Sequence, residues 1–309
     1  MKKVLVILSL FLGFAFVSCD RWVGDQEIPA YLKINKIELD TAGNADHGLL
    51  TSDIRSVRVV AFNKKENKNQ SIGVFELPCS VPVLLNGDVN IYLYPVIWQD
   101  YNKATQTVYP FYNSIPITAT LVPGEETVLD SVLYAERNNK ATEIALFENF
   151  EGISLDFITD SANLIRKTDT AKTGNSAGLI DFSKSDTILL FFNEIFYPSS
   201  SQLANSGLYL EFDYWTKDFL CIGIDGIDLY NDGYGIVRFQ EIQVSPVKDS
   251  STPLERGKWR KAYLALYPTL YKYFNIDKGF RIVLWAEKEK KENPYPGVYI
   301  DNLKLVHSK

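Results

Sequence analysis

The sequence predicts an all-β protein made of two β-sandwich domains. Aromatic residues make up 13% of the 309 residues, with 18 Tyr and 18 Phe, and this composition favours strands. Strand-length segments that alternate between apolar and polar residues are separated by turn residues along most of the chain. A chain of this length is long enough for two domains of the usual ~100 to 200 residues each.

The first 18 residues predict a secretory signal peptide. Lys2 and Lys3 form a short cationic head, an uncharged apolar run follows at residues 4–17, and Ser18 is a small residue at the predicted cleavage site. The run is too short to span a bilayer comfortably, which takes about 20 residues. We therefore expect the segment to be removed rather than to anchor the chain as a helix.

Cys19 follows the apolar run directly. Residues 16–20, Phe-Val-Ser-Cys-Asp, resemble the lipobox of bacterial lipoproteins, although Phe16 stands where that motif usually has Leu. The resemblance implies that Cys19 carries fatty acyl chains such as palmitate and that residues 19–28 are a lipidated tether at a membrane surface. Two or more acyl chains hold a protein stably at a membrane, whereas one holds it only marginally. The alternative is a soluble secreted protein whose signal ends near a Cys.

Acidic residues follow Cys19 at Asp20, Asp25 and Glu27. They loosely resemble the surface-export signal of lipoproteins from Bacteroidota, although they are spread out rather than contiguous. The resemblance implies an outer-membrane protein, either exposed on the cell surface or facing the periplasm.

The charge of the chain excludes some partners. The formal net charge is −6, and it becomes −8 when Lys2 and Lys3 are removed with the signal peptide. This acidic balance, without a basic tract, argues against nucleic acid and against anionic lipid headgroups as partners.

The cysteines and histidines predict neither a disulfide nor a catalytic site. Cys79 and Cys221 fall in different predicted domains, and because a disulfide needs Cα atoms within about 7 Å we expect two buried free thiols. His47 lies in a loop-like stretch and His307 in the C-terminal tail. No Ser-His-Asp or Cys-His arrangement is evident, so we expect no enzyme activity.

Residues 29–136 predict an antiparallel sandwich of immunoglobulin-like or carboxypeptidase-regulatory-like type. Residues 54–62 alternate, which places Val57 and Val59 on one face, and a solvated hairpin loop follows at residues 63–70. The Asn86-Gly87 pair is a hairpin signal because Asn-Gly readily takes positive φ. Further strands are expected at residues 31–39, 73–77, 78–85, 89–97, 118–122 and 127–134.

This first domain also resembles the front half of uncharacterised lipoproteins from Bacteroidota that share the two-domain layout. The segments that carry this resemblance are GVFELP at 73–78, VPVLLNG at 81–87, YPFY at 109–112 and VPGEET at 122–127. No biochemical activity follows from it. Residues 137–145, which begin with the polar run Arg-Asn-Asn-Lys, are the predicted linker, and because it is short we expect a fairly fixed orientation of the two domains.

Residues 146–309 predict a second sandwich. Its strands are expected at residues 187–192, 208–215, 219–224, 259–266, 280–286 and 298–306. This order, with FENFEG at 147–152, WRKAYL at 259–264 and IDNLKL at 300–305, resembles the galactose-binding-like jelly rolls, the family of many carbohydrate-binding modules. The resemblance implies a jelly roll with Trp259 in its core, and it says little about any one ligand.

Two strands of the second domain carry the predicted glycan-binding residues. In each strand, period-2 geometry separates an apolar face from a face that holds a tryptophan and charged groups. Indole rings beside carboxylates and a guanidinium can stack on pyranose rings and hydrogen-bond to them. The alternative is that these aromatic side chains pack against loops or the neighbouring domain. The six candidate residues are Glu211, Asp213, Trp215, Arg281, Trp285 and Glu287.

A structural calcium site is the second expectation. In the family that the second domain resembles, carboxylates near the first strand and on the last strand often share Ca²⁺, and Glu148, Glu151 and Asp301 stand in the matching motifs. Hard cations require 6 to 8 oxygen ligands. The alternative is that all three are ordinary surface or turn carboxylates. The acidic stretch at 225–233 lacks EF-hand spacing, so we expect a hairpin loop there.

A dense aromatic cluster in the first domain is a candidate protein interface. Exposed Tyr and Trp side chains commonly anchor such interfaces. Packing beneath a long loop at 98–116 is an equal alternative. Tyr109 and Phe111 belong to the same cluster, and the candidate contact residues are Tyr92, Tyr94, Trp98, Tyr101 and Tyr112.

Together these patterns predict a non-catalytic, lipid-anchored binding protein of the cell envelope. The second domain is its expected binding unit, and glycan is the candidate ligand. The alternative is a structural subunit that docks by its aromatic loops onto an outer-membrane protein complex for assembly, secretion or nutrient uptake. Calcium is the one expected ion, and no organic cofactor is expected.

Overall fold

The protein is nearly all β, in agreement with the predicted fold class. The computed structural model describes residues 27–41, 50–99, 105–158, 164–204, 207–226, 236–243, 259–268, 270, 279–288 and 297–309. These ranges contain strands β1 to β21 and one short helix, α2 (Ser200–Ala204). None of the helical turns within them is long and apolar enough to cross a membrane. The predicted signal peptide, Cys19, Tyr101 and residues 227–233 lie outside the described ranges.

The described residues of the first sandwich form ten strands. Their bounds are β1 (Ala30–Ile34), β2 (Ile37–Leu39), β3 (Ser56–Asn63), β4 (Lys68–Glu76), β5 (Cys79–Val83), β6 (Gly87–Trp98), β7 (Gln106–Val108), β8 (Ile115–Leu121), β9 (Glu126–Val128) and β10 (Leu133–Ala135). One sheet has the order β4-β3-β6-β7, with β8 also paired to β6. The other layer consists of the sheet β5-β1-β9 and the pair β10-β2. Their inward side chains, among them Leu32, Val59 and Leu93, are fully buried in one core.

Two hairpins were predicted in this domain, and the structure forms one of them. β3 and β4 pair antiparallel from Ser56↔Glu76 to Asn63↔Lys68, as the alternation predicted. Gly87 has a positive φ of 71°, as its turn requires, but the strands on either side do not pair with each other. β5 pairs with β1, whereas β6 pairs with β3 and β8. The turn therefore carries the chain between the two layers, and a local turn signal cannot tell this crossover from a hairpin.

In the second sandwich, eleven strands lie within the described ranges. Their bounds are β11 (Thr142–Glu148), β12 (Phe157–Ile158), β13 (Leu164–Lys167), β14 (Ala177–Asp181), β15 (Thr187–Phe192), β16 (Leu208–Trp215), β17 (Phe219–Gly226), β18 (Ile236–Gln243), β19 (Arg260–Ala265), β20 (Phe280–Glu287) and β21 (Gly297–Ser308). One sheet has the order β13-β14-β21-β16-β19, with β11 also paired to β21. The other has the order β12-β15-β20-β17-β18. Trp259 is 5% exposed in the core between them, as predicted.

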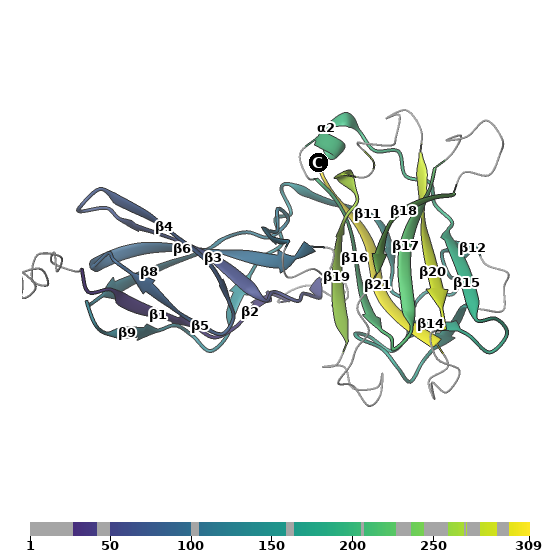
Figure 1. The fold of residues 1–309 in the computed structure, drawn as a ribbon, viewed down its shortest axis with the longest axis horizontal. Helices are drawn as coiled ribbons and strands as arrows, with labels where there is room; N and C mark the ends of the chain where they lie inside the picture. The colour runs from purple at the N-terminus through teal and green to yellow at the C-terminus, as the bar shows by residue number, and fades with distance from the viewer. Residues whose placement is uncertain are drawn as a thin grey trace, which may run out of the picture.

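The first sandwich lies against the outer face of one sheet of the second. In Figure 1 it extends from the side of β16, β19 and β21, while β12 and β15 lie at the far side of the molecule. Tyr209 and Tyr263, from the second sandwich, are buried in the core of the first. One sheet of the second sandwich is thus covered on both faces, and the outer face of its other sheet points away from the first sandwich.

Candidate functional site

Strand β16 lies beneath the first sandwich, which changes the environment of three predicted glycan-binding residues. A strand covered on one face alternates between buried and exposed residues, but all eight residues of β16 are buried. Glu211 and Trp215 are 0% exposed and Asp213 is 1% exposed. Trp215 packs in the core, with its ring 5.9 Å from that of Tyr299. The prediction that these three residues contact a ligand is wrong, because the neighbouring domain and the core cover them.

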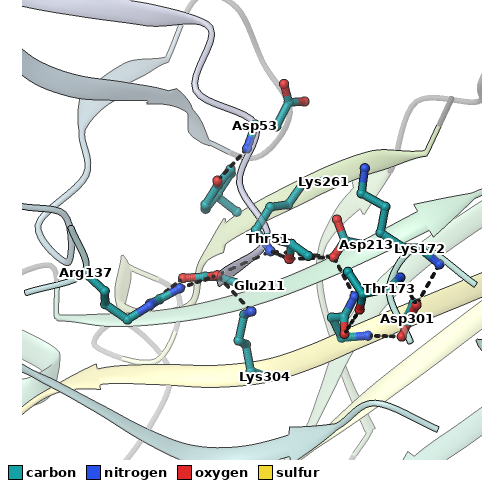
Figure 2. A network of polar contacts seen from close by, with 12 residues as sticks. Thr51, Asp53, Arg137, Lys172, Thr173, Glu211, Asp213, Lys261, Asp301 and Lys304 are labelled. Atoms are coloured by element: carbon teal, nitrogen blue, oxygen red, sulfur yellow. Dashed lines mark hydrogen bonds and ion pairs between the residues drawn. The ribbon is translucent and has the colours of Figure 1, made fainter. Parts of the chain in front are cut away.

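Glu211 is the centre of a cluster that we call the interdomain charge cluster, made of Arg137, Glu211, Asp213, Lys261 and Lys304. Arg137 donates from Nη1 to Oε1 and from Nη2 to Oε2 of Glu211, both at 3.2 Å. Lys261 and Lys304 place Nζ 3.4 and 3.8 Å from Oε2. Figure 2 shows the three cationic side chains converging on this one carboxylate. The side chains of Glu211 and its three cationic partners are each no more than 4% exposed, so this part of the cluster is sealed from water.

Tyrosines complete the contact around Glu211. The Tyr109 hydroxyl donates to Oε1 of Glu211 at 2.5 Å, and the hydroxyls of Tyr112 and Tyr263 lie 3.0 Å apart. The Tyr109 ring packs edge-on against Tyr209 and Tyr263, each with ring centroids 5.1 Å apart. Tyr263 also accepts a hydrogen bond from the Asp53 amide at 2.9 Å. Both sandwiches thus contribute to one continuous polar and aromatic contact.

Neighbouring charges and burial act in opposite directions on Glu211. Burial raises its pKa, but Arg137 first and then Lys261 and Lys304 outweigh it and hold the pKa well below the ordinary value. Burial, followed by the charge of Lys261, lowers the pKa of Lys304. Burial and then Glu211 raise the pKa of Tyr109. Glu211 is therefore a fixed anion that holds the domains together, and it is not placed to accept or release protons for a substrate.

Asp213 extends the cluster toward the last strand of the chain. Thr51 donates to Oδ2 of Asp213 at 2.7 Å and accepts a hydrogen bond from Lys261 at 2.9 Å. Asn302 donates from Nδ2 to the same carboxylate oxygen at 3.1 Å. Asp301, on β21, pairs with Asp213 across the two strands and is fully buried. Its burial, followed by the nearby charge of Asp213, raises the pKa of Asp301 to about 8.

The three predicted calcium ligands bind backbone amides. Glu148 accepts hydrogen bonds from the amides of Phe150 and Asp156 at 2.6 and 2.8 Å. Glu151 accepts from those of Asn175 and Ser176 at 2.7 and 2.6 Å. Asp301 accepts from three amides, which belong to Lys172, Thr173 and Asn302.

In the described part of the chain no three His, Cys, Asp or Glu side chains are grouped so that they could hold a metal ion. The predicted calcium site is therefore not assembled from Glu148, Glu151 and Asp301. Their carboxylates instead fix nearby loops through backbone hydrogen bonds.

The other three predicted glycan-binding residues lie on the sheet that the first sandwich leaves uncovered. We call its outward side the distal face. Across it, Trp285 pairs with Leu189 on one side and Cys221 on the other. The residues that alternation assigns to this face are Thr187, Leu189 and Phe191 on β15, Arg281, Val283, Trp285 and Glu287 on β20, and Phe219, Cys221, Gly223 and Asp225 on β17.

Exposure varies across the distal face. Leu189 is 41% exposed, and Trp285, Arg281 and Glu287 are half-buried. Val283 is buried although it belongs to neither core. The face therefore presents a partly accessible apolar and aromatic band near β15, with charged side chains along β20 and β17.

Most of the aromatic cluster of the first domain is used within the molecule. Tyr112 is 5% exposed and faces the second sandwich, so the protein interface predicted for it is an internal one. Trp98 is half-buried beneath the guanidinium of Arg55, 4.7 Å from its ring centroid. Tyr92 and Tyr94 lie on the outer face of the sheet β4-β3-β6-β7, where Tyr92 is 37% exposed. Only these two remain candidates for an external contact among the described members.

The sequence prediction missed Thr51, Arg137, Lys261, Lys304 and Tyr263. The sequence pattern places Arg137 in the linker and Lys261 and Lys304 in strand motifs. A signal was present, because a lysine whose position in a predicted strand points away from the core is solvated unless another surface covers it. Recognising it required knowing that the first sandwich covers this face.

No protein-family model and no curated protein matches the chain. Among solved structures, it is similar to the C-terminal family 22 carbohydrate-binding module of Clostridium thermocellum Xyn10B, at 12% identity and a TM-score of 0.32 over 55% of this chain and 96% of that one. A family 30 carbohydrate-binding module of a cellulosomal cellulase from C. thermocellum is 16% identical, with a TM-score of 0.31 over 53% of this chain and 92% of that one. Bacteroides ovatus SGBP-B, from a mixed-linkage glucan utilization locus, is 9% identical, with a TM-score of 0.16 over 91% and 96%. Scores this low assign no family, and the function has to be inferred from this chain's own residues.

Proposed function

We propose that this chain is a non-catalytic binding protein of the cell envelope whose second sandwich binds glycan on the distal face. The observation that carries the proposal is the position of Trp285. Its indole is half-buried beside the exposed Leu189, on the sheet face that the first sandwich does not cover. A half-buried indole in this position offers part of a flat apolar ring surface, which suits stacking on a sugar ring.

The surroundings of Trp285 support this function. Arg281, Asp225 and Glu287 provide hydrogen-bond donors and acceptors at the two ends of the apolar band. Glycan recognition needs both kinds of group, because a pyranose ring has apolar faces and a rim of hydroxyl groups. The carboxylates of Glu211 and Asp301 are buried and hydrogen-bonded within the protein, so they do not line the distal face.

Affinity electrophoresis of the Trp285→Ala variant tests the proposal. We expect a gel that contains a polysaccharide ligand to retard the full-length wild-type chain, whereas the variant should migrate freely in the same gel. Trp98→Ala is the matched control, because Trp98 is also half-buried but lies in the first sandwich. Unchanged retardation of Trp285→Ala, or equal loss in both variants, would contradict a binding site at Trp285.

A second function is favoured by one observation on the first sandwich. Tyr92 and Tyr94 share the outer face of their sheet with Arg58 and with Val74, which is 46% exposed. Such a surface suits docking onto an outer-membrane protein complex. Under this alternative, purification from detergent-solubilised membranes recovers a stable membrane partner with the wild-type chain and loses it with Tyr92→Ala, while Trp285→Ala keeps the partner.

We also propose that Cys19 is acylated and anchors the chain at the outer membrane. The support is the apolar run of residues 4–17 followed directly by Ser18 and Cys19. Metabolic labelling with a palmitate analogue is expected to mark the wild-type chain and not Cys19→Ala. An unlabelled wild-type chain, or a mature form that retains residues 1–18, would contradict the anchor.

A further inference from the structure

The charged side chains of the distal face are arranged around an ion pair between β17 and β20. Asp225 and Arg281 are direct partners across the two strands. Arg281 donates to Oδ2 of Asp225 from Nη2 at 2.5 Å and from Nε at 3.2 Å. The two side chains are 28% and 14% exposed, so the pair is partly accessible.

An aromatic ring on a neighbouring strand also helps to fix the position of the Arg281 guanidinium. Its Cζ atom lies 5.5 Å from the ring centroid of Phe191, on the neighbouring strand β15. Both hydrogen bonds end on Oδ2 of Asp225, and Oδ1 takes part in neither. A guanidinium has five N–H donors and a carboxylate about four acceptor sites. The pair therefore presents donors and acceptors side by side in a fixed geometry.

From this arrangement we infer that the distal face selects an uncharged oligosaccharide, with the Asp225–Arg281 pair binding its hydroxyl groups. This inference rests on the proposed glycan function. A hydroxyl group can both accept from a guanidinium and donate to a carboxylate, so adjacent hydroxyls complement both members of the pair.

Charge balance argues against an acidic glycan. Among the described side chains of β15, β17 and β20 on this face, the charged ones are Arg281, Asp225 and Glu287, so acids outnumber bases. A uronate or sulfate group at Arg281 would compete with Asp225 for the guanidinium, and one at the opposite end of β20 would meet Glu287, in a chain whose formal charge is −6. Like-charge contacts of this kind reject partners.

The spacing along β20 sets a minimum ligand length. Arg281 and Trp285 are four residues apart on one face of the strand, which corresponds to about 13 Å. That distance exceeds one sugar ring. A ligand that contacts both the indole and the ion pair is therefore an oligosaccharide or a polysaccharide segment.

Affinity electrophoresis of the full-length chain in detergent tests the inference with xylan, β-glucan and galactomannan as uncharged probes and polygalacturonate as the acidic probe. We expect at least one uncharged probe to retard the chain, and this retardation should change less than twofold between 50 and 500 mM salt. Polygalacturonate should cause no retardation. Asp225→Asn leaves the charge of Arg281 unbalanced, so it should weaken uncharged binding about tenfold and introduce salt-sensitive binding of polygalacturonate. Asp88→Asn, which breaks an exposed ion pair with Lys65 in the first sandwich, is the matched control and should change neither.

The outcomes separate the inference from the function on which it rests. Salt-sensitive retention of the wild-type chain by polygalacturonate alone overturns the inference and leaves glycan binding intact. Uncharged binding that Asp225→Asn leaves unchanged, in a variant with an unaltered thermal midpoint, also overturns it. If Asp225→Asn unfolds, the double variant Asp225→Asn/Arg281→Gln takes its place, because it removes both charges and keeps polar groups. Loss of uncharged binding in this variant would support the role of the pair as a charged unit, and unchanged binding would overturn the inference. Retention by none of the four probes overturns both proposals.

Discussion

The two outer faces of the second sandwich use similar residue types but have different surroundings. The face of β16, β19 and β21 carries Glu211 and Lys304, both fully buried beneath the first sandwich. The distal face carries Arg281 and Asp225, which are 28% and 14% exposed. A carboxylate next to a cation therefore lies sealed between two domains in one place and remains partly exposed in the other. The difference comes from what covers each face.

The largest effect is expected where the covered face loses its central anion. Glu211→Ala leaves Arg137, Lys261 and Lys304 buried without their main counter-ion, and breaking a buried pair in this way costs about 3–5 kcal/mol. Urea unfolding should show a lower midpoint, with the two sandwiches losing their common transition. Asp88→Asn, an exposed carboxylate, should leave the midpoint unchanged. A loss below about 1 kcal/mol in Glu211→Ala would mean that water or a neighbouring acid compensates the three cations.

A smaller loss is expected when only one donor to Glu211 is removed. Tyr109→Phe deletes the hydroxyl that donates at 2.5 Å and keeps the ring contacts with Tyr209 and Tyr263. Hydrogen bonds to charged groups contribute about 1.5–3 kcal/mol, so the free energy of unfolding should fall by this amount. Tyr94→Phe, on the outer face of the first sandwich, should have no measurable effect. Equal effects of the two variants would contradict a special role for the buried hydroxyl.

The pH dependence of stability should report Asp301. Burial and Asp213 raise its folded-state pKa from the ordinary 3.8 to about 8. The unfolded chain releases this proton near pH 4 and the folded chain near pH 8, so the contribution is complete below about pH 4 and is lost as pH rises to about 8. Asp301→Asn cannot ionise, and its unfolding free energy should therefore fall less than that of the wild type between these pH values. Parallel pH profiles for the two proteins would contradict the raised pKa.

The fold class was predictable from the sequence because alternation is a local signal. Val57 and Val59 are buried as their spacing indicated, and Trp259 lies in the core. The crossover at Gly87 was not predictable, since a turn that joins two layers and a turn that closes a hairpin use the same residues.

The candidate site was predictable only in part, and for a related reason. Arg281, Trp285 and Glu287 are half-buried on the side of their sheet that faces away from the core, as their alternation with core residues predicts. The same alternation predicts that Glu211, Asp213 and Trp215 share a face away from the core. Within the second sandwich this is correct for Glu211 and Asp213 and wrong for Trp215, which packs in the core. Alternation cannot report that the first sandwich covers that face. The contact between Arg137 and Glu211, for example, joins residues 74 positions apart in the chain.

The smallest effect on stability is expected at the exposed margin of the distal face. Leu189 is 41% exposed beside Trp285, so Leu189→Ala should change the free energy of unfolding by no more than about 0.5 kcal/mol. Its side chain nevertheless extends the apolar surface around the indole, so polysaccharide retardation should weaken while the melting curve stays in place. The next residue, Leu190, is fully buried in the core, so Leu190→Ala should lower the free energy of unfolding by about 2–5 kcal/mol. Its main effect should therefore be on stability and not on binding. If Leu189→Ala destabilises the protein as much as Leu190→Ala, the distal face is packed like the covered one, and a binding site beside Trp285 is excluded.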